Sequence, residues 1–171
     1  MQFTSLISTL TVALIAAATP GAALNYRSYS STVSCSGPSF GCSDGGAVCC
    51  GPMPAGFGFS AQFDNLAAGT QGQGYTDQCR AFLFAVFGPG TRCWNGGGAR
   101  ANYLNWFHSA GRVASSESGK ACVAPTDFEY EDGEGVKHAI KVPVGNANAT
   151  EVIAEHYRNK NWAALAAYEA L

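Results

Sequence analysis

The sequence predicts an α+β fold, a small disulfide-stabilised antiparallel sheet with one short helix and a C-terminal helix. Three observations support this prediction. Seven cysteines in 171 residues indicate disulfides. Short runs that alternate apolar with polar residues and end at glycine indicate strands. A helical pattern closes the chain, and 47% hydrophobic against 13% charged residues are enough to form a packed core.

The N-terminal segment resembles no part of a packed domain. Residues 6–18 form a largely apolar run without charged residues, and small residues follow this run. This pattern is typical of a secretory signal peptide, cleaved after Ala23 or alternatively after Ala18. The run is too short to cross a bilayer. We therefore expect residues 1–23 to be removed, and the mature protein to be extracellular without membrane insertion.

In an oxidising compartment most cysteines should pair, and the odd number leaves one unpaired. Neighbours on an extended chain point to opposite faces, so Cys49 and Cys50 should join different bridges. Cys122, distant from the others, is the candidate for the unpaired thiol, either buried or linking a dimer. No CxxC or HxxxH pairs are present, so we expect no metal and no other cofactor. The expected disulfide residues are Cys35, Cys42, Cys49, Cys50, Cys79, Cys93 and Cys122.

Residues 24–112 form a module rich in cysteine, glycine and aromatic residues. Residues 56–63 alternate and predict a half-buried strand, whereas residues 80–87 are apolar on both faces and predict a central strand. The glycine-rich segment 64–75 between them is either a solvated connection or a binding loop that presents Gln71, Gln73 and Tyr75.

Aromatic residues continue beyond this point. Helical spacing predicts a short helix over residues 99–108, after the glycine run 96–98. Trp94, Tyr103 and Trp106 are candidates for a surface that stacks on a sugar or a partner protein. The alternative, favoured for aromatic residues beside a disulfide, is that they pack in the core.

Residues 113–171 are expected to form a linker, a β-hairpin and a C-terminal helix packed on the same domain. Residues 127–131 and 136–144 are the expected strands, with three acids on one face and Lys137 and Lys141 opposite them. Asn148 and Glu151 have the spacing of a helix cap, and residues 159–161 should interrupt the helix. Asn148 also begins an Asn-Ala-Thr sequon for N-glycosylation.

Charge and motifs limit the function. Ten basic and twelve acidic residues give a net charge of −2, which excludes the basic surface that nucleic-acid binding requires. Nucleophile and metalloprotease motifs are missing, so we expect a protein that is not an enzyme. The alternative is a hydrolase with a non-obvious site, for which His108 and Asp77 are weak candidates as an acid–base pair.

The cysteine order C-x6-C-x6-CC from Cys35 to Cys50, with the stretches GQGYTDQC and FGPGTRCWNGGGARANYLNWFH, resembles small secreted cysteine-rich proteins of filamentous fungi. The resemblance implies a non-catalytic effector or interaction protein that binds a host or cell-wall component, either a protein or a polysaccharide. The segment Cys35–Cys42 also resembles virally encoded fungal killer toxins. That resemblance implies a membrane-active protein as a further alternative.

Overall fold

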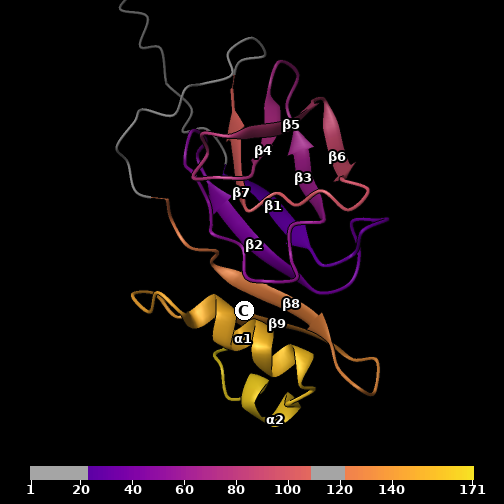
Figure 1. Ribbon diagram of the computed structural model, residues 1–171, viewed down its shortest axis with the longest axis vertical. Coiled ribbons are helices and arrows are strands. Elements are labelled where there is room, and N and C mark those ends of the chain that lie inside the picture. Colours follow the sequence, from indigo (N-terminus) through magenta and orange to yellow (C-terminus); the bar gives the residue numbers. More distant parts are fainter. Residues whose placement is uncertain (1–22, 109–121) are drawn as a thin grey trace, which may run out of the picture.

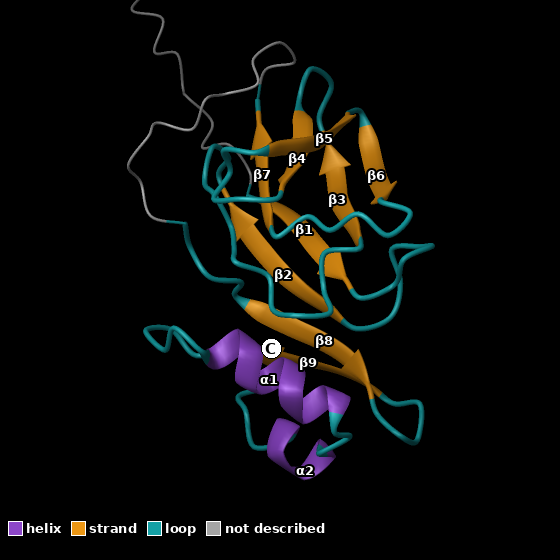
Figure 2. Cartoon of the chain, viewed as in Figure 1, coloured by secondary structure: helices purple, strands orange, loops and turns teal. Residues whose placement is uncertain are grey.

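The structure is a computed structural model that describes residues 23–108 and 122–171. Residues 1–22 of the predicted signal peptide and the predicted linker at 113–120 lie outside the described residues. Two antiparallel sheets and two short helices make up the described part, which confirms the α+β prediction (Figures 1 and 2).

The larger sheet has six strands in the order β6-β3-β1-β2-β8-β9, and the smaller has three in the order β5-β4-β7. The six are β1 (Leu24–Tyr29), β2 (Ser39–Asp44), β3 (Ser60–Leu66), β6 (Gly90–Asn95), β8 (Asp127–Glu131) and β9 (Lys137–Lys141). The three are β4 (Gln71–Tyr75), β5 (Phe82–Phe87) and β7 (Tyr103–Phe107). The helices are α1 (Ala149–Arg158) and α2 (Trp162–Leu165).

One face of the large sheet carries the core. Strand register places Tyr26 beside Phe63 and Phe40 beside Phe128, and all four side chains are fully buried. The small sheet covers the part of this face formed by β3 and β6, where Phe84 packs against Phe63 and Trp94. Helix α1 covers the β8 part, where Tyr157 contacts Phe128 with ring centroids 5.6 Å apart. The hairpin and helices therefore extend the same core that the module begins.

Glycines in β4 allow the two sheets to approach each other. A side chain at Gly72 would overlap the ring of Phe63, and one at Gly74 would overlap Phe84. Phe84 in turn stacks on Trp94 of β6 at 3.9 Å between centroids. The Gln-Gly-Gln-Gly sequence is thus a strand whose small residues face large aromatic rings.

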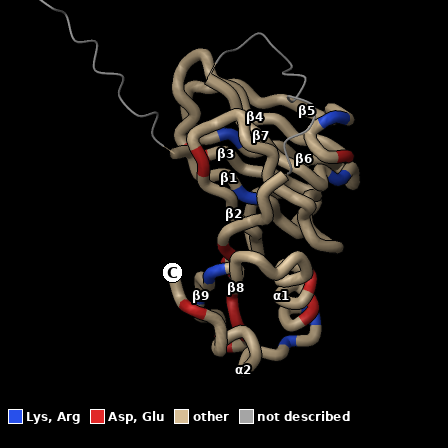
Figure 3. The backbone as a smooth tube through the Cα atoms, turned by 90° about the vertical axis from the view of Figure 1, so that its left-hand side faces the viewer, with Lys and Arg blue, Asp and Glu red and all other residues tan. Residues whose placement is uncertain are grey.

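The C-terminal half of the core is aromatic as well. Tyr130 of β8 stacks nearly parallel on Trp162, with centroids 6.0 Å apart, and Tyr157 contacts both rings. Charged residues gather around this half, on β8, β9 and α1, whereas the rest of the described chain carries few (Figure 3). The hairpin and helices therefore combine an aromatic interior with a charged exterior.

A loop at residues 51–58 connects the helix to the sheets. Arg100 donates from Nη2 to the carbonyls of Met53 and Pro54, at 2.8 and 2.6 Å. From helix α1, the Glu151 carboxylate accepts from the Ala55 amide at 2.9 Å, and the Arg158 side chain donates to the Ala55 carbonyl at 2.8 Å. The prediction of a capping box is therefore wrong. The Glu151 side chain binds the loop, and the Asn148 side chain makes no cap hydrogen bond.

Two disulfides connect segments of the cysteine-rich module. Cys35 bonds to Cys93, and Cys42 bonds to Cys50. Cys49 contacts other sulfurs, so the two adjacent cysteines join different bridges as predicted.

The β-hairpin is confirmed together with its register, since Asp127 pairs with Lys141 and Glu131 with Lys137. The interruption after α1 is also confirmed, because α1 ends at Arg158 and α2 begins at Trp162. Asn161 caps α2 through its side chain, which accepts from the Ala164 amide.

Three expectations for the module are wrong, and the strand expected over residues 56–63 is correct only from Ser60, where β3 begins. Residues 103–107 form strand β7 instead of a helix, because they pair along their length with β4. Most of the expected loop at 64–75 is strand, since β3 continues to Leu66 and β4 begins at Gln71. The segment expected as a central strand is β5, which lies at the edge of the small sheet and exposes Phe82 and Phe87.

Phe128 should be a major source of stability, because its buried ring contacts the large sheet, the loop and α1. We expect Phe128→Ala to lower the free energy of unfolding by about 3–5 kcal/mol. Denaturant unfolding followed by tryptophan fluorescence measures this change. Val144→Ala is the matched control, because Val144 is fully exposed. Equal stability of the two variants would contradict the packing described.

The fold should lose stability in alkali. Burial first, and then the charge of Asp44, raise the pKa of Tyr26 far above its ordinary value, and burial raises the pKa of Tyr75 to about 12. The folded state therefore holds these protons more tightly than the unfolded chain. The contribution of these two tyrosines to stability should be constant below about pH 10 and fall above it, by about 1.4 kcal/mol per pH unit for each tyrosine.

Denaturant unfolding at about pH 9 and about pH 11 tests this expectation. Tyr26→Phe removes the tyrosine whose pKa is raised furthest, so its loss of stability between these pH values should be smaller than that of the wild type. An equal loss in both proteins would show that Tyr26 does not contribute.

Candidate functional site

The residues expected to form a binding loop are buried. Gln71, Gln73 and Tyr75 lie on β4, the central strand of the small sheet, and each is at most 4% exposed. The Tyr75 hydroxyl donates to the side-chain oxygen of Gln73. These side chains therefore cannot form a binding surface, and the prediction is wrong.

The aromatic candidates also belong to the core. Trp106 is buried and donates from its indole nitrogen to the Asp44 carboxylate at 3.0 Å. Trp94 is half-buried because it stacks on Phe84, and half-buried Tyr103 lies against Gly51. The alternative interpretation, that these residues pack in the core, is confirmed for Trp106 and for Trp94, which packs against the core.

The proposed acid–base pair is not assembled. His108 follows the end of β7 beside Gln71, whereas Asp77 follows the opposite end of β4, beyond Tyr75. A strand rises about 3.3 Å per residue, so β4 alone separates these ends by about 13 Å. Proton transfer requires about 3 Å. His108 lies instead against the ring of Trp106 and the Gly45 carbonyl.

A groove of about 700 Å³ lies on the outer face of the large sheet. One wall is the loop at residues 35–37, and the other is the β8–β9 hairpin with Glu129, Glu131 and Lys137. Tyr29, nearly buried, lies between the two walls. The Cys35–Cys93 disulfide ties the loop to β6, so both walls are anchored to the same sheet.

An ion-pair network supports the floor beside this groove. Arg27 of β1 reaches two carboxylates of β8: Asp127, and Glu129 at 3.0 Å. Gly41 of β2 lies between Arg27 and Asp127 in the register. A side chain at Gly41 would overlap the Asp127 carboxylate, so glycine allows the pair to form across an intervening strand.

The charged side chains at the groove differ in how exposed they are. Arg27 and Asp127 are each 13% exposed and pair with each other, whereas Glu129 is half-exposed and Glu131 and Lys137 are exposed. Burial is the main cause that raises the pKa of Tyr29, and the positive charge of Arg27 opposes it. The groove therefore offers two accessible carboxylates, one ammonium group and a neutral phenol edge.

The turn that joins β8 to β9 is fixed by a carboxylate. Asp132 accepts from the backbone amides of Glu134 and Val136 and contacts Nε2 of His138 at 2.7 Å. The bond to His138, followed by that to the Val136 amide, lowers the pKa of Asp132. The sequence pattern predicts this hairpin and its acidic face, but the alternation of charges does not indicate that a loop 90 or more residues earlier faces the hairpin.

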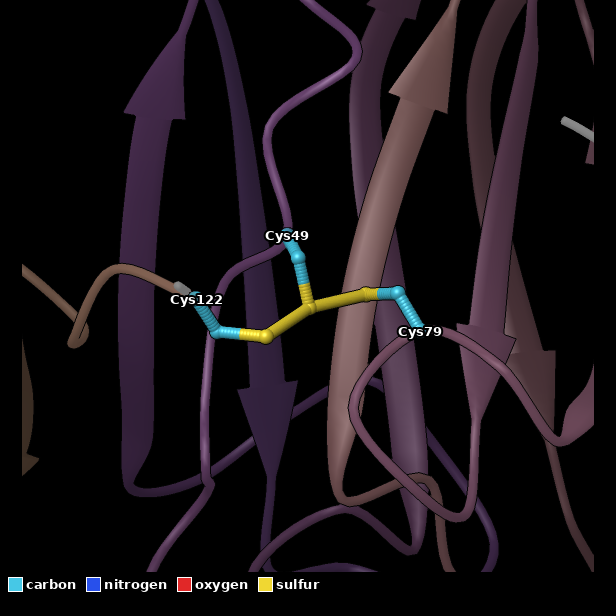
Figure 4. A group of neighbouring side chains, drawn as sticks. All are labelled: Cys49, Cys79 and Cys122. Atoms are coloured by element: carbon cyan, nitrogen blue, oxygen red, sulfur yellow. A yellow bond between two sulfur atoms is a disulfide. The ribbon is translucent and has the colours of Figure 1, made fainter. Parts of the chain in front are cut away.

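A second cluster lies between the sheets. The sulfurs of Cys49, Cys79 and Cys122 lie within 4.8 Å of one another, and Cys49 occupies the middle position (Figure 4). As three thiolates they would suit a soft metal ion, whereas as a disulfide and a thiol they would not. Both bonding contacts of Cys49 favour the oxidised arrangement.

Comparisons with known proteins identify no relative. No protein-family model, curated protein or solved structure matches this chain. The function of the protein is therefore inferred from the chemistry of its own residues.

Proposed function

We propose that this protein is a secreted, non-catalytic interaction protein, of the kind that filamentous fungi release as effectors, and that it binds a host or cell-wall component through the groove. Cysteine pairs at bonding distance support an oxidising compartment. Strand β1 begins at Leu24, the residue that cleavage after Ala23 would leave as the new N-terminus. Of the helices in the described part, none has the length and apolar character needed to cross a membrane.

The groove is the proposed binding site. It is concave, and the Cys35–Cys93 bridge and the hairpin turn restrain its walls, so little conformational entropy would be lost on binding. Its accessible polar groups are Glu129, Glu131 and Lys137. Such groups suit a ligand rich in hydroxyl or amino groups, which describes both polysaccharides and basic protein segments.

Secretion predicts a defined mature product. Protein recovered from the medium of a eukaryotic secretion host should begin at Leu24 and carry disulfides. Asn148 is exposed, so it is available to carry an N-glycan. Intact mass before and after deglycosylation, with N-terminal peptide mapping, measures all three properties. Retention of the unprocessed chain inside the cell with reduced cysteines would contradict the proposal.

The groove predicts a binding surface that can be removed without unfolding the protein. We expect the purified protein to sediment with insoluble chitin or β-glucan, or to label intact host cells. The double variant Glu129→Gln/Glu131→Gln should weaken that binding by about ten-fold or more, the loss expected when charge-assisted hydrogen bonds worth about 1.5–3 kcal/mol are weakened.

Glu155→Gln is the matched control, because Glu155 is exposed on α1, outside the residues that line the groove. It should bind as the wild type does. Absence of binding to all three probes would contradict the proposed function, and equal loss in both variants would contradict the groove as the binding site.

A further inference from the structure

Cys49 contacts two cysteines that compete for it. Its Cα atom lies 5.9 Å from that of Cys79 and 4.7 Å from that of Cys122. Both separations fall within the range that a disulfide spans, about 4.4–6.8 Å. A sulfur forms only one disulfide, so whenever Cys49 is bonded to one of these cysteines, the other remains beside the bond without it as a partner.

Backbone hydrogen bonds hold the Cys122 segment beside Cys49 whichever disulfide exists. The Val123 amide donates to the Cys49 carbonyl, and the Gly51 amide donates to the Val123 carbonyl, both at 2.8 Å. These bonds keep Cys122 beside Cys49 without a disulfide. Cys50 makes two further backbone hydrogen bonds with Leu104 of β7, at 2.9 Å, which fix the segment on the small sheet.

The two possible thiols differ in exposure. Cys79 is 1% exposed, and its sulfur lies 3.7 Å from the Leu104 carbonyl oxygen. Cys122 is half-buried, as is Cys49. A thiol at Cys79 is therefore shielded from reagents in solution, whereas a thiol at Cys122 is accessible to them.

We propose that Cys49, Cys79 and Cys122 form a thiol–disulfide exchange site, in which Cys49 alternates between two partners and Cys122 accepts a small external disulfide. In the internal step, the Cys79 thiolate attacks the Cys49 sulfur, the Cys49–Cys122 bond breaks, and Cys122 leaves as a thiolate that takes up the proton lost by Cys79. No oxidant or reductant is consumed, because one disulfide and one thiol are present before and after.

The external step uses the exposed thiol. The Cys122 thiolate attacks one sulfur of a low-molecular-weight disulfide such as oxidised glutathione, forms a mixed disulfide, and releases one molecule of the reduced thiol. This step leaves the Cys49–Cys79 bridge in place. Modification of Cys122 therefore draws all molecules into the Cys49–Cys79 form.

Peptide mapping of the wild type tests the internal step without any variant. The full mature protein, secreted and oxidised, is quenched in acid, alkylated after denaturation and digested. We expect one alkylated cysteine per molecule, divided between Cys79 and Cys122, and both the Cys49–Cys79 and Cys49–Cys122 linked peptides. A single linkage that persists at neutral pH with a trace of added thiol would overturn the proposal. Three free thiols, with or without a copurified metal, would also overturn it.

Oxidised glutathione tests the external step. The wild type should gain one glutathione on Cys122, and the Cys49–Cys122 peptide should disappear as the adduct forms. Cys79→Ser and Cys122→Ser are matched variants, because each keeps one bridge to Cys49 and has no unpaired cysteine. Neither should gain glutathione. An adduct on Cys79, or an adduct on Cys79→Ser, would overturn the assignment of Cys122 as the accepting thiol.

Discussion

One short segment, from Cys49 to Gly51, contacts both sheets and the chain that leads into β8, and the position of the C-terminal hairpin depends on it. Cys50 pairs through its backbone with Leu104 of the small sheet and through its sulfur with Cys42 of the large sheet. Cys49 and Gly51 form backbone hydrogen bonds with Val123, just before the chain enters β8. The segment thus fixes the separation of the sheets and brings the C-terminal hairpin back to the edge of β2.

That return explains why the hairpin and helices form a continuous body with the cysteine-rich module. Strand β8 pairs with β2, and Arg27 of β1 reaches across β2 to bind the β8 carboxylates. On the opposite face of the same strand, Phe128 packs between Phe40 and Tyr157. One strand therefore contributes charge to the groove and an aromatic ring to the core, because alternate side chains point to opposite faces.

Local patterns predicted the elements whose neighbours in sequence are also neighbours in space. The hairpin could be predicted because Asp127 and Lys141 pair through a short turn, and the separate bridges of Cys49 and Cys50 follow from strand geometry. The strand at residues 103–107 could not be predicted in this way, because its pairing with β4 depends on glycines that lie about thirty positions earlier.

The candidate sites failed for the same reason. Gln73 and Tyr75 appear polar and solvated in sequence, yet both are buried on the central strand of the small sheet. The groove could not be predicted either, since its walls come from segments that only the sheet order brings together. A pattern of alternating acids indicates an exposed face but gives no sign of what lies opposite that face.

The end of the chain forms part of the large sheet's boundary. The Lys141 amide donates to the Glu169 carbonyl, the Leu171 amide donates to the Ala139 carbonyl, and Ile140 and Ala170 form a bridge. These contacts occupy backbone groups of β9 that would otherwise face another molecule's strand. Residues 169–171 thus shield this sheet edge from fibril-like association, a hazard at high local concentration for a chain whose described part is mostly strand and carries few charges on its module.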